Sequence, residues 1–291
     1  MSGESGDVTG PRRVPRALRS GSFLVGGFIV AGLLVAALAA PWLAPYAPTA
    51  IFPGAEIRPP GPRFLLGTDE VGRDILSRVL YGTRVSLGVA IPSVALAVLT
   101  GTTLGVGLGY WGGAPDLLAM RLFDVLFAFP PILLAIALVA ALGPSTVNLV
   151  LTIAVLTLPQ FAVLARSATL ALKPQDFVQA ARALGASHGR ILGAHVLPNI
   201  APTLAVQASL SLSIVILVEA ALSFLGLGTQ PPAPSWGSML SRGRQYMTIA
   251  PWLVLAPGLA IMLAVLGFNL LGDAQRDLLD PRRAGARRRN P

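Results

Sequence analysis

The chain has 291 residues, of which 54% are hydrophobic and 12% are charged, and its formal net charge is +9. A soluble domain usually carries about twice this share of charged residues, because a charged surface keeps it dissolved. The composition therefore argues against a soluble enzyme and against a disordered protein, and it indicates a membrane protein that crosses the bilayer several times.

Six apolar segments are each long enough to cross a bilayer as a helix, which takes about 20 residues. We expect the spans at approximately 23–43, 85–110, 125–142, 146–165, 203–227 and 249–271. The third and fourth come from one uncharged stretch that Gly143-Pro144-Ser145 divides. Backbone amides in lipid must bond within their own segment, so the predicted fold class is an all-α integral membrane protein with six transmembrane helices.

The first span has a second interpretation as a signal peptide. Four arginines precede it, and Ala37-Leu38-Ala39 resembles a cleavage site. The apolar run is longer than the 7–15 residues that are typical of a signal peptide, which favours a span that is retained.

The basic residues indicate the orientation of the chain. With a cytoplasmic N-terminus, fifteen of the 22 lysines and arginines fall inside and seven outside. We therefore expect both termini in the cytoplasm, with the basic tails 1–20 and 276–291 close to anionic membrane lipid rather than to nucleic acid. Between them lie the first helix and a proline-rich outer linker (21–80) and a five-helix core (81–275), which includes a cytoplasmic loop (166–202).

Two outer segments are long and rich in proline. The first covers about residues 44–80 and is expected to be an extended linker, and the second covers about residues 228–248. Packing at the membrane interface and contact with an outside partner explain both segments equally well.

The cytoplasmic loop 166–202 has the pattern of a helix–turn–helix. Asp176 suits the positive end of a helix dipole. An apolar stripe with the spacing i, i+3, i+4, i+7 consists of Phe177, Ala180, Ala181 and Leu184. Gly185 is placed to end this helix in the left-handed conformation.

A second short helix is expected after this turn. Ser187 is suited to cap it, and Pro198 and Pro202 are expected to break it before the fifth span. An amphipathic hairpin that lies on lipid is the alternative. The small residues of the stripe and the turn favour close contact with another protein instead.

This loop resembles the EAA loop of binding-protein-dependent ABC importer permeases. That pattern reads E-A-A, three residues, G, nine residues, I, one residue, L-P. The chain has Gln179-Ala180-Ala181, Gly185 and Leu197-Pro198 in the matching places, with Gln179 for the glutamate and His195 for the isoleucine.

The wider chain is similar to the dipeptide, oligopeptide and nickel branch of this family, over about residues 20–282. The segments that carry the similarity are 66–74, 177–199, 223–228, 230–237 and 269–281. The additional first span and the proline-rich linker resemble the C-type subunit of that branch.

The resemblance implies a type I ABC importer permease fold in the cytoplasmic membrane and a complex of several chains. This subunit would pair with a related B-type permease. Two cytoplasmic P-loop ATPase subunits, which bind ATP and Mg²⁺, would attach beneath it. A periplasmic or lipid-anchored substrate-binding protein would deliver di- or oligopeptides above it. Nickel or another small solute is the alternative cargo.

The resemblance also assigns roles to individual residues. It places ATPase coupling on Phe177, Gln179, Ala180, Ala181, Leu184, Gly185 and Pro198. The candidates for contact with an outer partner lie in the two long outer segments and are Asp69, Arg73, Asp74 and Trp236.

Catalytic chemistry is not expected in this chain. There is no cysteine, and the two histidines, His188 and His195, do not have the spacing of four that a helical zinc pair needs. The single lysine, Lys173, is not part of a P-loop. We therefore expect a transport subunit with no cofactor and no metal site of its own, and ATP hydrolysis by its partners.

Glu219 is the one acidic residue within a clear predicted span. A charge at membrane depth costs about 2.5–3.5 kcal/mol on insertion scales, so this side chain should face protein or water. One interpretation is a pathway or gate residue that senses the amine of a peptide. The favoured interpretation is an interhelical hydrogen bond that orders the fifth span.

Three other classes of protein fit the sequence less well. An ion-coupled secondary transporter is disfavoured because no internal repeat is evident and ion coupling needs more buried acids. A membrane-bound enzyme is disfavoured because no convergent set of reactive groups lies at depth. A scaffold or channel half does not account for the EAA-like loop.

Overall fold

The computed structural model describes residues 21–279, a range that is mainly helical and contains one isolated bridge, between Thr68 and Asp74. The longer helices are α1 (Gly21–Leu43), α2 (Ile75–Trp111), α3 (Gly113–Ala128), α4 (Pro131–Leu142), α5 (Thr146–Leu172), α8 (Leu197–Phe224) and α10 (Trp252–Leu279). The shorter elements are α6 (Asp176–Ala183), α7 (His188–Arg190), the π-helix η2 (Ile191–Val196), α9 (Trp236–Gly243) and the 3₁₀-helix η3 (Arg244–Tyr246). The expectations for the basic tails fall outside the described residues, except that α10 extends to Leu279.

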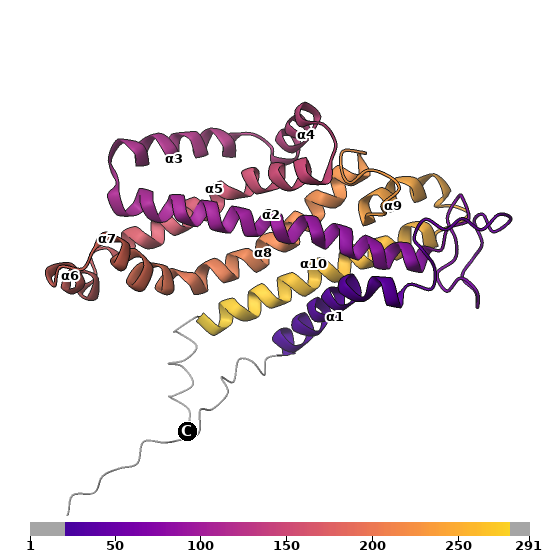
Figure 1. The fold of residues 1–291 in the computed structure, drawn as a ribbon, viewed down its shortest axis with the longest axis horizontal. Coiled ribbons are helices and arrows are strands. Elements are labelled where there is room, and N and C mark those ends of the chain that lie inside the picture. Colours follow the sequence, from indigo (N-terminus) through magenta and orange to yellow (C-terminus); the bar gives the residue numbers. More distant parts are fainter. Residues whose placement is uncertain (1–20, 280–291) are drawn as a thin grey trace, which may run out of the picture.

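The long helices lie side by side between two different ends of the molecule (Figure 1). One end, called here the hairpin end, carries α6 and α7. The other, called here the linker end, carries residues 44–74 and residues 225–251 with α9. The described chain starts and finishes on the hairpin side of the bundle.

Within residues 21–279, five helices are long and apolar enough to cross a membrane: α1, α2, α5, the continuous run from α7 to α8, and α10. A sixth crossing requires α3 and α4 to act as one broken span, because their axes differ by 97°. The third span, expected at 125–142, therefore differs from the structure: its helix begins at Gly113 and is interrupted before Pro131.

The interruption follows from two consecutive prolines. Phe129 precedes Pro130 and takes extended backbone angles (φ −90°, ψ 141°), as residues before proline prefer. Pro130 also lacks the amide that a continuing helix needs, while Pro131 suits the first turn of α4. The Pro-Pro pair is visible in the sequence, and it interrupts the helix although the whole stretch is hydrophobic.

The expected break before the fifth span is wrong. The chain continues without a gap from α7 through η2 into α8, so that residues 188–224 form one run of helix. Pro198 lies in the first turn of α8, where a missing amide is tolerated, and the preceding turns adopt π geometry. Asn199 donates a side-chain hydrogen bond to the carbonyl of His195 at 2.6 Å.

Helices α2 and α5 pack closely because three glycines of α2 share one face. A Cβ atom at Gly101, Gly105 or Gly109 would lie 2.6, 2.1 or 2.8 Å from a backbone oxygen of α5. Glycines four residues apart allow two membrane helices to approach until their backbones are in contact. Because this contact is between backbones, we expect α2 and α5 to move together.

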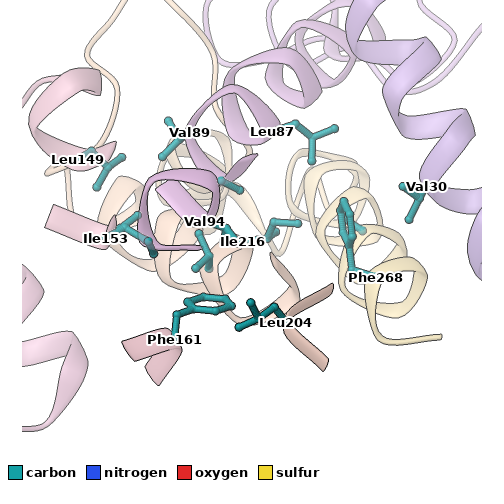
Figure 2. Close-up of a cluster of buried hydrophobic side chains, with 14 of the residues drawn as sticks. Val30, Leu87, Val89, Val94, Leu149, Ile153, Phe161, Leu204, Ile216 and Phe268 are labelled. Carbon is teal, nitrogen blue, oxygen red and sulfur yellow. The ribbon is translucent and has the colours of Figure 1, made fainter. Parts of the chain in front are cut away.

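The core of the bundle lies where α2, α5, α8 and α10 meet (Figure 2). Phe161 and Ile216 are fully buried there, and Val94 and Leu87 from α2 pack in the same cluster. Lipid is as apolar as these side chains, so close packing holds the helices together more than removal from water does.

The first helix, α1, packs against α10. A Cβ atom at Gly26 would lie 2.9 Å from Leu270, and one at Gly267 would lie 2.7 Å from Ile29. Val30 and Phe268 contribute to the common core from these two helices. The helix is thus part of the bundle, which is the arrangement expected of a retained span.

The proline-rich segment after α1 is more compact than the extended linker that its composition suggests. The rings of Tyr46, Phe52 and Phe64 form a cluster with centroid distances of 4.9–5.7 Å. The guanidinium of Arg63 lies over two of these rings, at 5.3 and 5.2 Å. Aromatic contacts therefore give this segment a small core of its own at the linker end.

Candidate functional site

The hairpin of α6 and α7 is built by local capping. Gly185 has φ +79°, which a residue with a side chain rarely adopts, and it ends α6 as expected. The amides of Gly185 and Ala186 bond back to the carbonyls of Arg182 and Ala181, each at 3.0 Å. The side chain of Ser187 accepts from the amide of Arg190, which confirms the expected cap of the second helix.

The hairpin presents an open groove of about 520 Å³. Its lining residues are Phe177, Ala180, Ala181, Leu184, Gly185, Ala186, Arg190 and His195. Leu184 is 88% exposed and Phe177 is 42% exposed. A leucine that projects so far from the hairpin next to small residues is suited to insertion into a partner protein.

The groove brings together five of the seven residues assigned to ATPase coupling. The other two lie outside its lining. Gln179 donates its side-chain amide to the carbonyl of Lys173 at 2.8 Å, so it ties α6 to the end of α5. Pro198 lies in the first turn of α8. Arg190, which the sequence reasoning did not single out, joins the groove.

An ion network joins three elements at the linker end. The carboxylate of Asp69 accepts from Arg73 at 2.6 Å and lies 3.5 Å from the guanidinium of Arg78 in α2. Glu70 lies 3.2 Å from Arg73 and 3.8 Å from Arg242 in α9. Because its members come from different elements, the network holds the 44–74 segment, α2 and α9 in one arrangement.

The residues expected to contact an outer partner are largely enclosed by this chain. Asp69, Asp74 and Trp236 are 3%, 2% and 0% exposed, and the side chain of Arg73 is 11% exposed. Asp74 caps α2 by accepting from the amide of Ser77 at 2.8 Å. These side chains therefore support the surface of the linker end and form little of it themselves.

Trp236 attaches α9 to the bundle. Its indole donates to the carbonyl of Val79 at 3.3 Å, and its ring lies against Gly82, where a Cβ would be 3.0 Å away. Gly237 beside it lies so close to Ala220 that a Cβ would be 2.2 Å from that carbonyl. α9 therefore contacts α2 and α8 with almost no intervening space.

Glu219 is fully buried in α8 within this single chain. One carboxylate oxygen accepts from Ser223 at 2.7 Å, and the other has no hydrogen-bond partner among the described residues. Glu219 does not line the hairpin groove or the cavity that lies between α3, α4, α5 and α8. Ser223 belongs to the same helix, so this bond is not the interhelical bond that was expected. The ordering role and the pathway role of Glu219 both stay predictions.

A cavity of about 140 Å³ lies within the bundle, between α3, α4, α5 and α8. Its lining is mostly apolar, and its polar members are Thr157 and Gln160 of α5. Pro159, which also lines the cavity, lies inside α5 and lacks the amide that would bond to the preceding turn of that helix.

These features define a polytopic helical membrane protein with a folded segment at each end. Residues 101–285 match the family described as the binding-protein-dependent transport system inner membrane component. Residues 16–60 match the N-terminal TM domain of oligopeptide transport permease C, which includes most of the α1 and linker region.

Curated relatives extend the similarity over most of the chain. The dipeptide transport system permease protein DppC of Alkalihalophilus pseudofirmus is 49% identical over 79% of this chain and 76% of its own. The di/tripeptide transport system permease protein DppC of Pseudomonas aeruginosa is 47% identical over 84% and 82%. The glutathione transport system permease protein GsiD of Pectobacterium atrosepticum is 50% identical over 75% and 72%.

The chain belongs to the family of binding-protein-dependent transport system inner membrane components. It is a multi-pass inner-membrane permease subunit, and the expectation of a transport subunit rather than an enzyme is confirmed. The match to residues 16–60 also places α1 inside the family's membrane domain, in agreement with a retained span.

Proposed function

We propose that this chain is a membrane subunit of an ATP-driven importer that carries di- or oligopeptides from a binding protein into the cytoplasm. The observation that carries the proposal is the similarity, at 47–50% identity, to three permeases whose names specify dipeptides, di- and tripeptides, and glutathione. All three solutes are short peptides. Nickel or another small solute remains the alternative cargo.

The hairpin end is proposed to face the cytoplasm and to bind one of two P-loop ATPase subunits, which hold ATP and Mg²⁺. The exposed Leu184 and the groove beside it support this role, because an apolar side chain next to a groove lined by small residues can pack closely against a partner protein. The positive-inside rule supports the same orientation, with both termini in the cytoplasm.

The linker end is proposed to face the binding protein. Its segments 44–74 and 225–251 are held together by the ion network and by Trp236, so they offer a preformed surface. A preformed surface binds with a smaller entropy cost than a flexible one. The candidate contacts Asp69, Arg73, Asp74 and Trp236 would thus act through the surface that they support.

A related B-type permease is proposed to complete the translocation path, which works by alternating access. ATP binding would draw the ATPase pair together and displace the hairpin. α8 would follow because it is continuous with the hairpin through η2. α2 and α5 would move as one unit because of their backbone contact, and the path would open at the linker end.

The test is purification of this chain with its co-expressed partners from gently solubilised membranes, followed by reconstitution. Recovery of a second permease and P-loop ATPases, with ATP-dependent uptake of a labelled dipeptide that requires the binding protein, is the expected result. Uptake of nickel in place of peptide would select the alternative cargo. Recovery of the chain alone, with ion-driven uptake and no nucleotide hydrolysis, would contradict the proposal.

A further inference from the structure

Tyr110, in the last turn of α2, lies where the hairpin meets the bundle. Its side chain is buried, with 4% of the residue exposed, although the hairpin around it is largely exposed. Three residues from three different places in the hairpin region contact it: Lys173 after α5, Arg182 in α6 and His188 in α7.

The contacts involve three parts of the tyrosine: its hydroxyl, its backbone carbonyl and its ring. The hydroxyl lies 2.8 Å from Nδ1 of His188 and accepts from Arg182 at 3.4 Å. The backbone carbonyl accepts from the ammonium of Lys173 at 2.8 Å. The ring has the charged groups of Lys173 and Arg182 at 5.9 and 5.7 Å from its centre, distances at which cations are attracted to an aromatic face.

The helix that carries Tyr110 reaches the opposite end of the molecule. α2 runs from the hairpin end to the linker end, where the carbonyl of Val79 accepts from Trp236 of α9. Between these two points, Gly101 and Gly105 place α2 in backbone contact with α5. A displacement applied at Tyr110 thus acts on a helix that is packed along its length and touches the outer elements.

We propose that Tyr110 is a positioning residue that transmits displacement of the hairpin to α2, and through α2 to the linker end. This inference rests on the proposed ATPase contact at the hairpin. The route is separate from the continuous connection of the hairpin to α8 and adds to the contact between α5 and α2, so loss of the Tyr110 side chain leaves the ATPase attached while α2 follows the hairpin only through α5. The result is ATP hydrolysis with less transport.

The experiment measures peptide imported per ATP hydrolysed in the reconstituted complex. Tyr110→Leu is expected to lower this ratio by about fivefold or more, the scale of a typical coupling between two sites. Tyr110→Phe keeps the ring and the Lys173 contact, so an intermediate loss is expected. Tyr81→Leu, which makes the same substitution near the other end of α2, is the matched control and should keep the wild-type ratio.

A second measurement separates transmission from simple destabilisation. If the hydroxyl acts through His188, then Tyr110→Phe and His188→Ala should lower the ratio equally, and the double variant should be no worse than either single one. His188→Gln retains a polar partner for the hydroxyl and should restore much of the loss. Additive losses, or no rescue by His188→Gln, would overturn the route through the hydroxyl.

The outcomes also distinguish this inference from the proposed function. A wild-type ratio in Tyr110→Leu, with ATPase bound and transport active, would overturn the role of Tyr110 and leave the proposed function standing. Absence of ATP-driven uptake by the wild-type complex would overturn the proposed function itself. A reduced ratio in Tyr110→Leu with the ATPase still co-purifying would support both.

Discussion

The two ends of this permease are attached to the same bundle in different ways. At the linker end, Trp236 and Asp69 are buried and contact α2, so segments distant in sequence hold one another. At the hairpin end, Val178 is the one residue of α6 that is buried in the described structure, and Leu184 projects into the open. The linker end is thus fixed by packing between distant segments, whereas the hairpin is shaped by its own turn and caps and has its surface open to a partner.

The largest loss of stability is expected at the linker end. Trp236→Ala removes a fully buried indole between α9 and α2, and truncating a buried aromatic side chain to alanine typically costs about 3–5 kcal/mol. Thermal unfolding of the solubilised protein should show a clearly lower midpoint. Trp42→Ala, at a tryptophan that is 83% exposed, is the control and should have a much smaller effect. Equal midpoints for the two variants would contradict the packed linker end.

A smaller and more local effect is expected in the turn of the hairpin. Gly185→Val places a β-branched residue at φ +79°, and such backbone strain costs about 1–3 kcal/mol. We expect the turn to rearrange and ATPase co-purification to fall, while the unfolding midpoint of the bundle changes little. Gly189→Val, at a helical glycine with open space around it, is the matched control. Normal ATPase binding by Gly185→Val would refute the assignment of this turn to coupling.

A still smaller change in stability is expected for Glu219→Gln. Glutamine can keep the hydrogen bond with Ser223, and one such bond contributes about 1 kcal/mol. We expect the complex to assemble normally, with reduced peptide uptake if Glu219 also serves the transport cycle. Ser223→Ala, which removes the partner and leaves the carboxyl group, serves for comparison. Normal uptake by Glu219→Gln would remove this residue from the mechanism.

The smallest change in stability is expected on the exposed surface of the hairpin. Leu184→Ser should alter the free energy of unfolding by no more than about 0.5 kcal/mol, because the side chain is 88% exposed. It should nevertheless weaken ATPase co-purification, since the groove loses its projecting apolar group. Leu65→Ser makes the same change at a leucine of the linker end that is 60% exposed. If both variants retain the ATPase equally, Leu184 does not contribute to the docking site.

Local rules were enough to predict the turn of the hairpin. Gly185 ends α6 and Ser187 caps α7 as expected, because capping depends on a few neighbouring residues. The same reasoning failed at Pro198, which lies in the first turn of α8 directly after the π-helix, so that the helix continues. The third span was also predicted to continue through Pro130 and Pro131, because the stretch is uniformly hydrophobic. In the structure these two prolines separate α3 from α4.

The candidate site was predicted in part. The i, i+3, i+4, i+7 stripe correctly grouped Phe177 with Leu184 in one groove, since helical spacing determines which residues share a face. It did not reveal Tyr110, which lies 72 positions from Arg182 and 78 from His188. An aromatic pair at the end of an apolar run, Tyr110-Trp111, was the available signal, and it indicates a membrane interface rather than a contact partner.

The sequence by itself determined the class of this protein. Its long apolar segments are suited to lipid, and in lipid a helix satisfies the backbone hydrogen bonds within each segment. It also determined the turn and caps of the hairpin, which need no distant residue. The tertiary structure decided which side chains of the linker end are exposed enough to contact a partner. Asp69, Asp74 and Trp236 stand in segments that seemed suited to an outer partner, yet they are enclosed. Burial depends on what distant segments bring to a residue, and local sequence does not contain that information.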